Sequence, residues 1–105
     1  MKRSIEEQKE FLWYEHQVRK LSEKNYRKEY LDGKKYRGKG YELDHRMSIV
    51  ECFEQEVPVE CAGHICNLKL IPKQQNRSKG RYSELTFQEL LDEIVERDSF
   101  FMGDF

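Results

Sequence analysis

Two short alternating segments, set between two stretches with a helical pattern, constrain the fold of this chain more than any other feature. Residues 41–45 (YELDH) and residues 67–71 (NLKLI) each alternate in the way that is typical of a short strand. Residues 46–66 between them are acidic and include the turn-forming Pro58 and Gly63, so we expect them to be irregular. The order of these segments predicts a small α+β protein.

The N-terminal part, residues 1–32, is predicted to be helical. Ser4 and Glu7 match a capping box that begins a helix. Ser22 is a candidate N-cap for a separate, second short helix, which Gly33 would end. Apolar side chains recur at spacings of three and four residues in the first of these helices: Phe11, Tyr14, Val18 and Leu21.

A C-terminal amphipathic helix is predicted over residues 86–97. Thr86 and Glu89 match a second capping box, and Leu85 and Leu90 match the hydrophobic staple that accompanies it. The tail that follows is apolar for a chain end. It either docks on the core, which we favour, or supplies a contact to a partner. The predicted buried face of the helix consists of Phe87, Leu90, Leu91, Ile94 and Val95.

Charge is strongly partitioned along the chain, although the net charge of the 105 residues is only −1. Residues 1–46 carry a net +4, residues 47–66 a net −4, residues 67–82 a net +5, and residues 83–105 a net −6. Two basic blocks can bind a polyanion locally even in a neutral protein. Charge alone favours an ordinary solvated surface.

The length and the apolar content indicate a single domain over residues 1–105 and exclude a membrane partner. No apolar run approaches the length of a membrane-spanning helix, and the first ten residues lack the apolar stretch of a secretory signal. Three cysteines, an odd number, argue against a disulfide framework and for a reducing compartment. We therefore expect a cytoplasmic protein.

Several polar residues stand at the ends of the predicted elements. Asp44 and His45 close the first strand, and Asn67 begins the second. Pro72 ends the second strand and can begin a helix over residues 73–79, on which Asn76 lies. Taken singly, each of these residues has an ordinary structural explanation in a turn or on a surface.

Taken together, these residues and the segments around them resemble the motif of a known protein family. The chain reads ELDHRMSI, then GHICNLKLIP, then QQNRSKG, and this order resembles the ββα-metal motif of the HNH endonucleases. The motif would occupy residues 41–80. The wider resemblance covers roughly residues 17–82 and is to small HNH proteins of bacteriophage and homing-endonuclease type, which implies a phage or bacterial host context.

The resemblance implies a role for each residue. Asp44 matches the carboxylate that binds the metal, and Asn76 matches a second metal ligand. His45 matches the general base, and Asn67 matches the asparagine that orients the histidine. Lys79 matches a basic residue near the DNA backbone. Oxygen ligands of this kind suit Mg²⁺ or Mn²⁺, and a largely neutral histidine can accept a proton from water.

DNA is therefore the expected partner, and the basic blocks would bind its phosphates without reading its sequence. The candidate DNA-binding residues are Lys34, Lys35, Arg37, Lys39, Lys73, Arg77, Lys79 and Arg81.

The chain departs from many HNH proteins because it has no paired CxxC zinc knuckles. Cys52, Cys61 and Cys66 have no standard zinc spacing, and although His64 could complete a four-ligand set, we favour ordinary core thiols over a structural zinc site. His64 is expected to pack or hydrogen-bond in its loop, and His16 is interpreted as structural.

The sequence thus predicts a metal-dependent HNH endonuclease that nicks or cuts DNA, as a monomer or a homodimer. The alternatives are a non-catalytic DNA-binding or accessory protein that retains the fold, and a zinc-stabilised interaction module.

Overall fold

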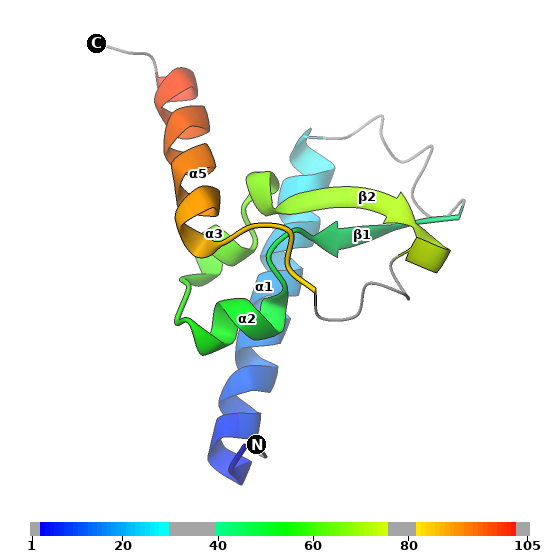
Figure 1. Cartoon of the computed structure of the whole chain (residues 1–105), viewed down its shortest axis with the longest axis vertical. Helices are drawn as coiled ribbons and strands as arrows, with labels where there is room; N and C mark the ends of the chain where they lie inside the picture. The colour runs from blue at the N-terminus through cyan, green and yellow to red at the C-terminus, as the bar shows by residue number, and fades with distance from the viewer. Residues whose placement is uncertain (1–2, 30–39, 76–81, 103–105) are drawn as a thin grey trace.

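The protein is a small α+β structure in which a long N-terminal helix, a two-stranded antiparallel sheet and a C-terminal helix pack together (Figure 1). The computed structural model describes residues 3–29, 40–75 and 82–102. The elements in chain order are α1 (Ile5–Glu29), β1 (Tyr41–His45), α2 (Ile49–Glu54), α3 (Val59–Ala62), the 3₁₀ helix η2 (Ile65–Asn67), β2 (Leu68–Pro72) and α5 (Phe87–Met102).

Helix α1 begins as the sequence predicts, because the amide of Glu7 donates to Ser4 Oγ across 3.1 Å. The prediction of a second helix starting at Ser22 is wrong: α1 continues through this residue to Glu29. Ser22 lies on the buried face, where its hydroxyl bonds back to the carbonyl of Val18. The buried residues of α1 recur every four positions: Tyr14, Val18, Ser22 and Tyr26.

The two predicted strands pair with each other in antiparallel register, so that Asp44 lies opposite Lys69 and His45 lies opposite Leu68. The second strand begins one residue later than predicted, because Asn67 is the last residue of η2. Residues 73–75, directly after β2, are helical, as predicted for the start of the segment 73–79. The rest of that segment lies outside the described residues.

The connection between the strands was expected to be irregular, and this prediction is wrong. It contains α2, α3 and η2, each of them short. Ser48 caps α2 by accepting from the amide of Glu51. Gly63 ends α3 directly against α1, where a Cβ atom on it would lie 3.1 Å from the Leu21 side chain. A larger residue at this position would require the Leu21 side chain to move by a few tenths of an ångström.

Helix α5 has the predicted capping box. The amide of Glu89 donates to Thr86 Oγ1 across 3.2 Å, and the amide of Thr86 donates to Glu89 Oε1 across 2.8 Å. The helix extends to Met102, five residues beyond the predicted end, and Val95 is 57 % exposed rather than buried. The predicted docking of the apolar tail concerns side chains that the structure does not describe.

The hydrophobic core lies where α1, the connection between the strands and α5 meet. Among the helices of the described residues, none is both long and apolar enough to cross a lipid bilayer. The buried residues of the core are Tyr14, Val18, Met47, Ile49, Cys52, Val57, Ala62, Leu85, Leu90 and Ile94.

Candidate functional site

His45 is the last residue of β1 and is buried against α1, with 8 % of its surface exposed. Its ring nitrogen Nε2 lies 2.8 Å from Ser22 Oγ. Ser22 is itself buried, and its Oγ lies 2.6 Å from the carbonyl oxygen of Val18, one turn earlier on the helix. The histidine of the candidate site is therefore attached to α1 through a serine that the sequence pattern suggested was an N-cap.

This pair of contacts favours one tautomer of the His45 ring. A hydroxyl has one proton to donate, and a 2.6 Å separation from a carbonyl oxygen requires that the proton of Ser22 lie between Oγ and Val18. Ser22 Oγ consequently accepts from His45 Nε2–H. In the neutral ring the lone pair is then on Nδ1, so Nδ1 is the nitrogen that can accept a proton.

Asn67 is completely buried and fixes the backbone directly after His45. Its Oδ1 accepts from the amide of Met47 across 2.7 Å, and its Nδ2 donates to the carbonyl oxygens of Met47 and Ala62 across 3.1 and 2.8 Å. The backbone oxygen of Asn67 also accepts from the amide of Arg46. Any orientation of His45 by Asn67 therefore acts through the main chain at Arg46 and Met47.

Asp44 precedes His45 on the same strand and is partly buried. Successive residues of a strand point to opposite faces, so Asp44 and His45 can serve one site only where the strand stops. β1 does stop at His45, and the chain bends at residues 46–47. A carboxylate at this position is a suitable oxygen ligand for Mg²⁺ or Mn²⁺.

Most of the other predicted site residues cannot be placed. Asn76 lies outside the described residues, and so do seven of the eight candidate DNA-binding residues: Lys34, Lys35, Arg37, Lys39, Arg77, Lys79 and Arg81. The eighth, Lys73, is exposed on the helical segment that follows β2. The predicted pairing of Asp44 with Asn76 at a metal therefore stays a prediction.

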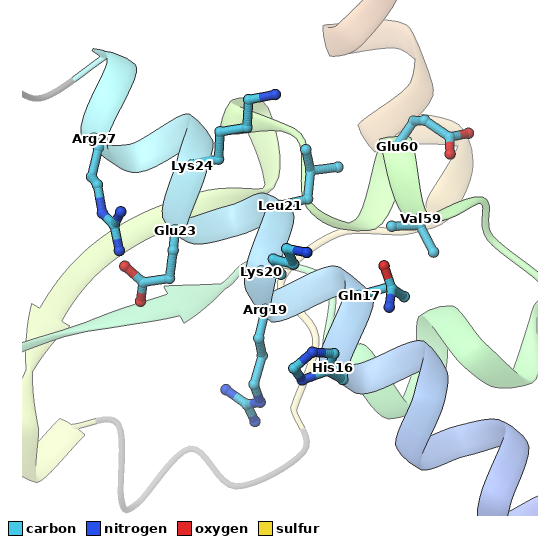
Figure 2. A pocket seen from close by; sticks show the side chains of 10 residues that line it. All are labelled: His16, Gln17, Arg19, Lys20, Leu21, Glu23, Lys24, Arg27, Val59 and Glu60. Carbon is cyan, nitrogen blue, oxygen red and sulfur yellow. The ribbon is translucent and has the colours of Figure 1, made fainter.

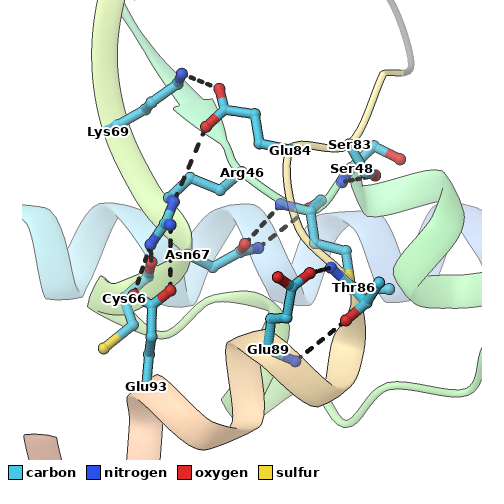
Figure 3. A network of polar contacts seen from close by, with 11 residues as sticks. Arg46, Ser48, Cys66, Asn67, Lys69, Ser83, Glu84, Thr86, Glu89 and Glu93 are labelled. Atoms are coloured by element: carbon cyan, nitrogen blue, oxygen red, sulfur yellow. Dashed lines mark hydrogen bonds and ion pairs between the residues drawn. The ribbon is translucent and has the colours of Figure 1, made fainter.

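A polar network that the sequence analysis missed holds the end of β1 against α5 (Figure 3). Arg46 contacts Glu93 with two nitrogens, at 2.7 and 3.1 Å, and also donates to the carbonyl oxygen of Cys66. Glu84 bridges the guanidinium of Arg46 and the ammonium group of Lys69. Because these partners are 15 to 47 residues apart, no local sequence pattern indicates them.

Cys52 is buried in the core, and Cys61 and Cys66 are partly buried. Burial raises the pKa of each of the three thiols. Within residues 3–29, 40–75 and 82–102, no three His, Cys, Asp or Glu side chains come together as metal ligands would. His64 hydrogen-bonds in its loop, as expected: Nδ1 accepts from the amide of Cys66, and Nε2 lies 3.2 Å from Asp98 Oδ1. His16 is exposed on α1.

No protein-family model matches the chain, and neither a curated protein nor a solved structure matches it. The resemblance to HNH endonucleases therefore stays a prediction, which depends on the three sequence motifs ELDHRMSI, GHICNLKLIP and QQNRSKG.

Proposed function

We propose that the protein is a metal-dependent HNH endonuclease that hydrolyses phosphodiester bonds of DNA. The observation that carries this proposal is the setting of His45 at the end of β1. The ring is buried, its Nε2–H is held by Ser22, and Asn67 fixes the backbone that follows it. A general base needs a defined orientation and one basic nitrogen, and both follow from these contacts.

In the proposed reaction, His45 Nδ1 accepts a proton from the water that attacks phosphorus. The P–O bond to the leaving sugar oxygen breaks as the new P–O bond forms, and the leaving oxygen takes a proton from solvent. The Ser22 contact is retained in this step, because Nε2 carries a proton in both the neutral and the charged ring. Asp44, together with Asn76, would hold the divalent ion. The positive charge of the ion would stabilise the negative charge that develops on the phosphate oxygens. The partly buried carboxylate of Asp44 is compatible with this role.

A non-catalytic DNA-binding protein that retains the HNH fold is the second candidate. The observation that favours it is the structural use of Asn67, because all three side-chain hydrogen bonds of this residue hold the main chain together. A protein that had lost its activity would keep these bonds for stability alone.

Incubation of supercoiled plasmid with the protein in Mg²⁺, Mn²⁺ or EDTA tests the proposal. We expect nicked circles with either metal and intact plasmid in EDTA. His45→Gln retains an amide that can donate to Ser22 but cannot act as a base, so cleavage should fall by roughly 10²–10⁴ while DNA binding survives. His16→Gln makes the same change at an exposed position of α1 and should cut at the wild-type rate.

Equal cleavage by the wild type and His45→Gln would refute the assignment of the base. Binding of DNA by the wild type without cleavage in any metal would favour the non-catalytic candidate.

A further inference from the structure

The exposed side of α1 carries a regular row of side chains. Its members are alternately four and three residues apart, which is the spacing that keeps side chains on one side of a helix. Trp13 in this row is nine residues from the buried Ser22, or about two and a half turns, so the row lies opposite the serine that contacts His45. The row, which we call the outer row, consists of Glu6, Glu10, Trp13, Gln17, Lys20 and Lys24.

Trp13 leaves a large apolar surface uncovered. The residue is 63 % exposed, although tryptophan is enriched at the buried centre of protein interfaces. A single exposed apolar residue is ordinary on a protein surface, so the neighbourhood of Trp13 decides what this exposure means.

An open groove of about 970 Å³ follows the outer row from Gln17 onward, where α1 meets α3 (Figure 2). Leu21 and Val59 give it an apolar wall, to which the methylene chains of Lys20 and Lys24 add. Figure 2 shows Gln17 extending toward Val59. The outer side of α1 therefore combines an exposed aromatic side chain with an apolar hollow a turn further along the helix.

The charge of α1 changes sign halfway along the helix. Residues 5–15 contain four Glu and one Lys, a formal −3, and residues 16–29 contain five Lys or Arg and two Glu, a formal +3 with His16 neutral. Two such helices packed in parallel would oppose like charges at both ends, whereas in antiparallel orientation each acidic half faces a basic half. Arg19 is paired with Glu15 of its own helix and lies outside the outer row. A second copy in antiparallel orientation is thus complementary at both ends.

We propose that α1 pairs in antiparallel orientation with α1 of a second copy of this chain. The spacing of the outer row is the same in both directions, so a single register aligns all of its members. In that register Glu6 lies opposite Lys24 of the other copy, Glu10 opposite Lys20, and Trp13 opposite Gln17. Trp13 of each copy then covers the beginning of the groove of the other.

The inference goes beyond the proposed function and does not depend on it. Because the outer row is opposite Ser22, the pairing leaves His45 of both copies on the outer sides of the dimer. One helix pair is a small interface, so the dimer should be a weak and reversible one.

Sedimentation velocity and Trp13 fluorescence test the pairing at protein concentrations up to about 1 mM. We expect the average mass to rise from 12.8 kDa toward twice that value. The emission maximum should move to shorter wavelength over the same range, because the only tryptophan of the chain becomes buried at the interface. A rise in mass without a change in emission would place the contact elsewhere and overturn the proposal.

Trp13→Ala and Leu12→Ala are a matched pair. The two residues are neighbours with exposed fractions of 63 % and 61 %, but Leu12 lies about 100° away around the helix and is outside the outer row. Trp13→Ala should raise the Kd of the dimer at least about tenfold, and Leu12→Ala should leave it unchanged. Equal effects would show that general apolar exposure causes the association, which contradicts the proposal.

Charge reversal tests the orientation of the two helices. Glu6→Lys/Glu10→Lys makes every charged member of the outer row basic and should abolish the dimer. Adding Lys20→Glu/Lys24→Glu restores opposite charges across an antiparallel pair, so the quadruple variant should dimerise again. It should not pair with the wild type, because like charges would then face each other along the row. Lys and Glu have similar helix propensities, and circular dichroism checks that α1 is retained.

The outcomes separate this inference from the proposed function. A wild type that stays at 12.8 kDa throughout, or a folded quadruple variant that stays monomeric, overturns the pairing. Preferential pairing of the quadruple variant with the wild type would indicate parallel helices and would also overturn it. Trp13→Ala should nick plasmid at the wild-type rate, because no residue of the proposed site comes from the other copy. Absence of nicking by the wild type would contradict the proposed function and leave the pairing standing.

Discussion

Ser22 in the middle of α1 accepts a hydrogen bond from Nε2 of His45, 23 residues further along the chain. The bond joins the longest helix to the end of β1, and it is possible because the single proton of Ser22 is donated to Val18. One serine thereby connects the histidine ring to α1, and in the proposed reaction this contact leaves Nδ1 as the basic nitrogen.

Ser22→Ala should change the protonation pattern of His45. The substitution leaves a buried Nε2–H without its acceptor, so we expect the free energy of unfolding to fall by about 1–3 kcal/mol and the Nδ1–H tautomer to become populated. ¹⁵N chemical shifts of the His45 ring, which differ between the tautomers, are the direct measurement. Plasmid nicking should decrease in parallel.

Ser83→Ala is the matched control for this experiment, because Ser83 Oγ also accepts one hydrogen bond, from the amide of Ser48. It should lower stability without moving the His45 ring shifts. Unchanged shifts in Ser22→Ala would show that Ser22 does not set the tautomer.

Asn67→Asp should destabilise the protein strongly despite the nearly identical shape of the two side chains. The new carboxylate would point at the carbonyl oxygens of Met47 and Ala62, where Asn67 now donates. We expect a loss of several kcal/mol, measured by urea unfolding at pH 7.

Protonation of the carboxyl group that Asn67→Asp introduces would restore one donor, so the pKa of that group should be raised in the folded variant. The stability of the variant relative to the wild type should therefore be greatest at low pH and should decrease as pH rises through that pKa. Asn25→Asp, which loses a single bond to the carbonyl of Gly63, should cost less. Equal losses at the two positions would contradict the structural role assigned to Asn67.

The Arg46–Glu93 pair should contribute a measurable but modest coupling energy. Its side chains are 28 % and 43 % exposed, so solvent screens the attraction, but the contact uses two nitrogens and two oxygens. A double-mutant cycle with Arg46→Met and Glu93→Gln should give about 0.5–1 kcal/mol. The same cycle on Arg19 and Glu15 within α1 should give less, since Arg19 is 61 % exposed. A larger coupling for the α1 pair would argue against the importance of the Arg46 network.

Alkaline pH should destabilise the protein through Cys52. Burial raises the pKa of this thiol from its ordinary value of 9.0 to about 12, so the unfolded chain loses the proton first. The stabilising effect is complete below pH 9 and should be lost as pH rises toward 12. Urea unfolding between pH 8 and pH 11 should show a shallower decline in Cys52→Ala than in the wild type. Part of the decline should remain, because burial also raises the pKa of Tyr14. Identical declines would exclude Cys52 as the cause.

The sequence by itself determined the features that depend on neighbouring residues. The beginnings of α1 and α5 were predictable because Ser4 and Thr86 bond amides three residues away, and the two strands were predictable because their alternation is local. The residues of the candidate site were selected in another way, through the resemblance of their order to the HNH motif, and their roles stay a prediction.

The tertiary structure decided what those residues contact. Ser22 is as suitable for a helix N-cap as for a buried bond within a helix, and only the distant His45 distinguishes the two uses. The short helices between the strands were missed because they are too short to show a periodic pattern, and they form by packing against α1 and by the bonds of Asn67. The physical reason is the same in each case: a side chain carries its chemistry with it, but its partner is supplied by a part of the chain that is brought close only when the core forms.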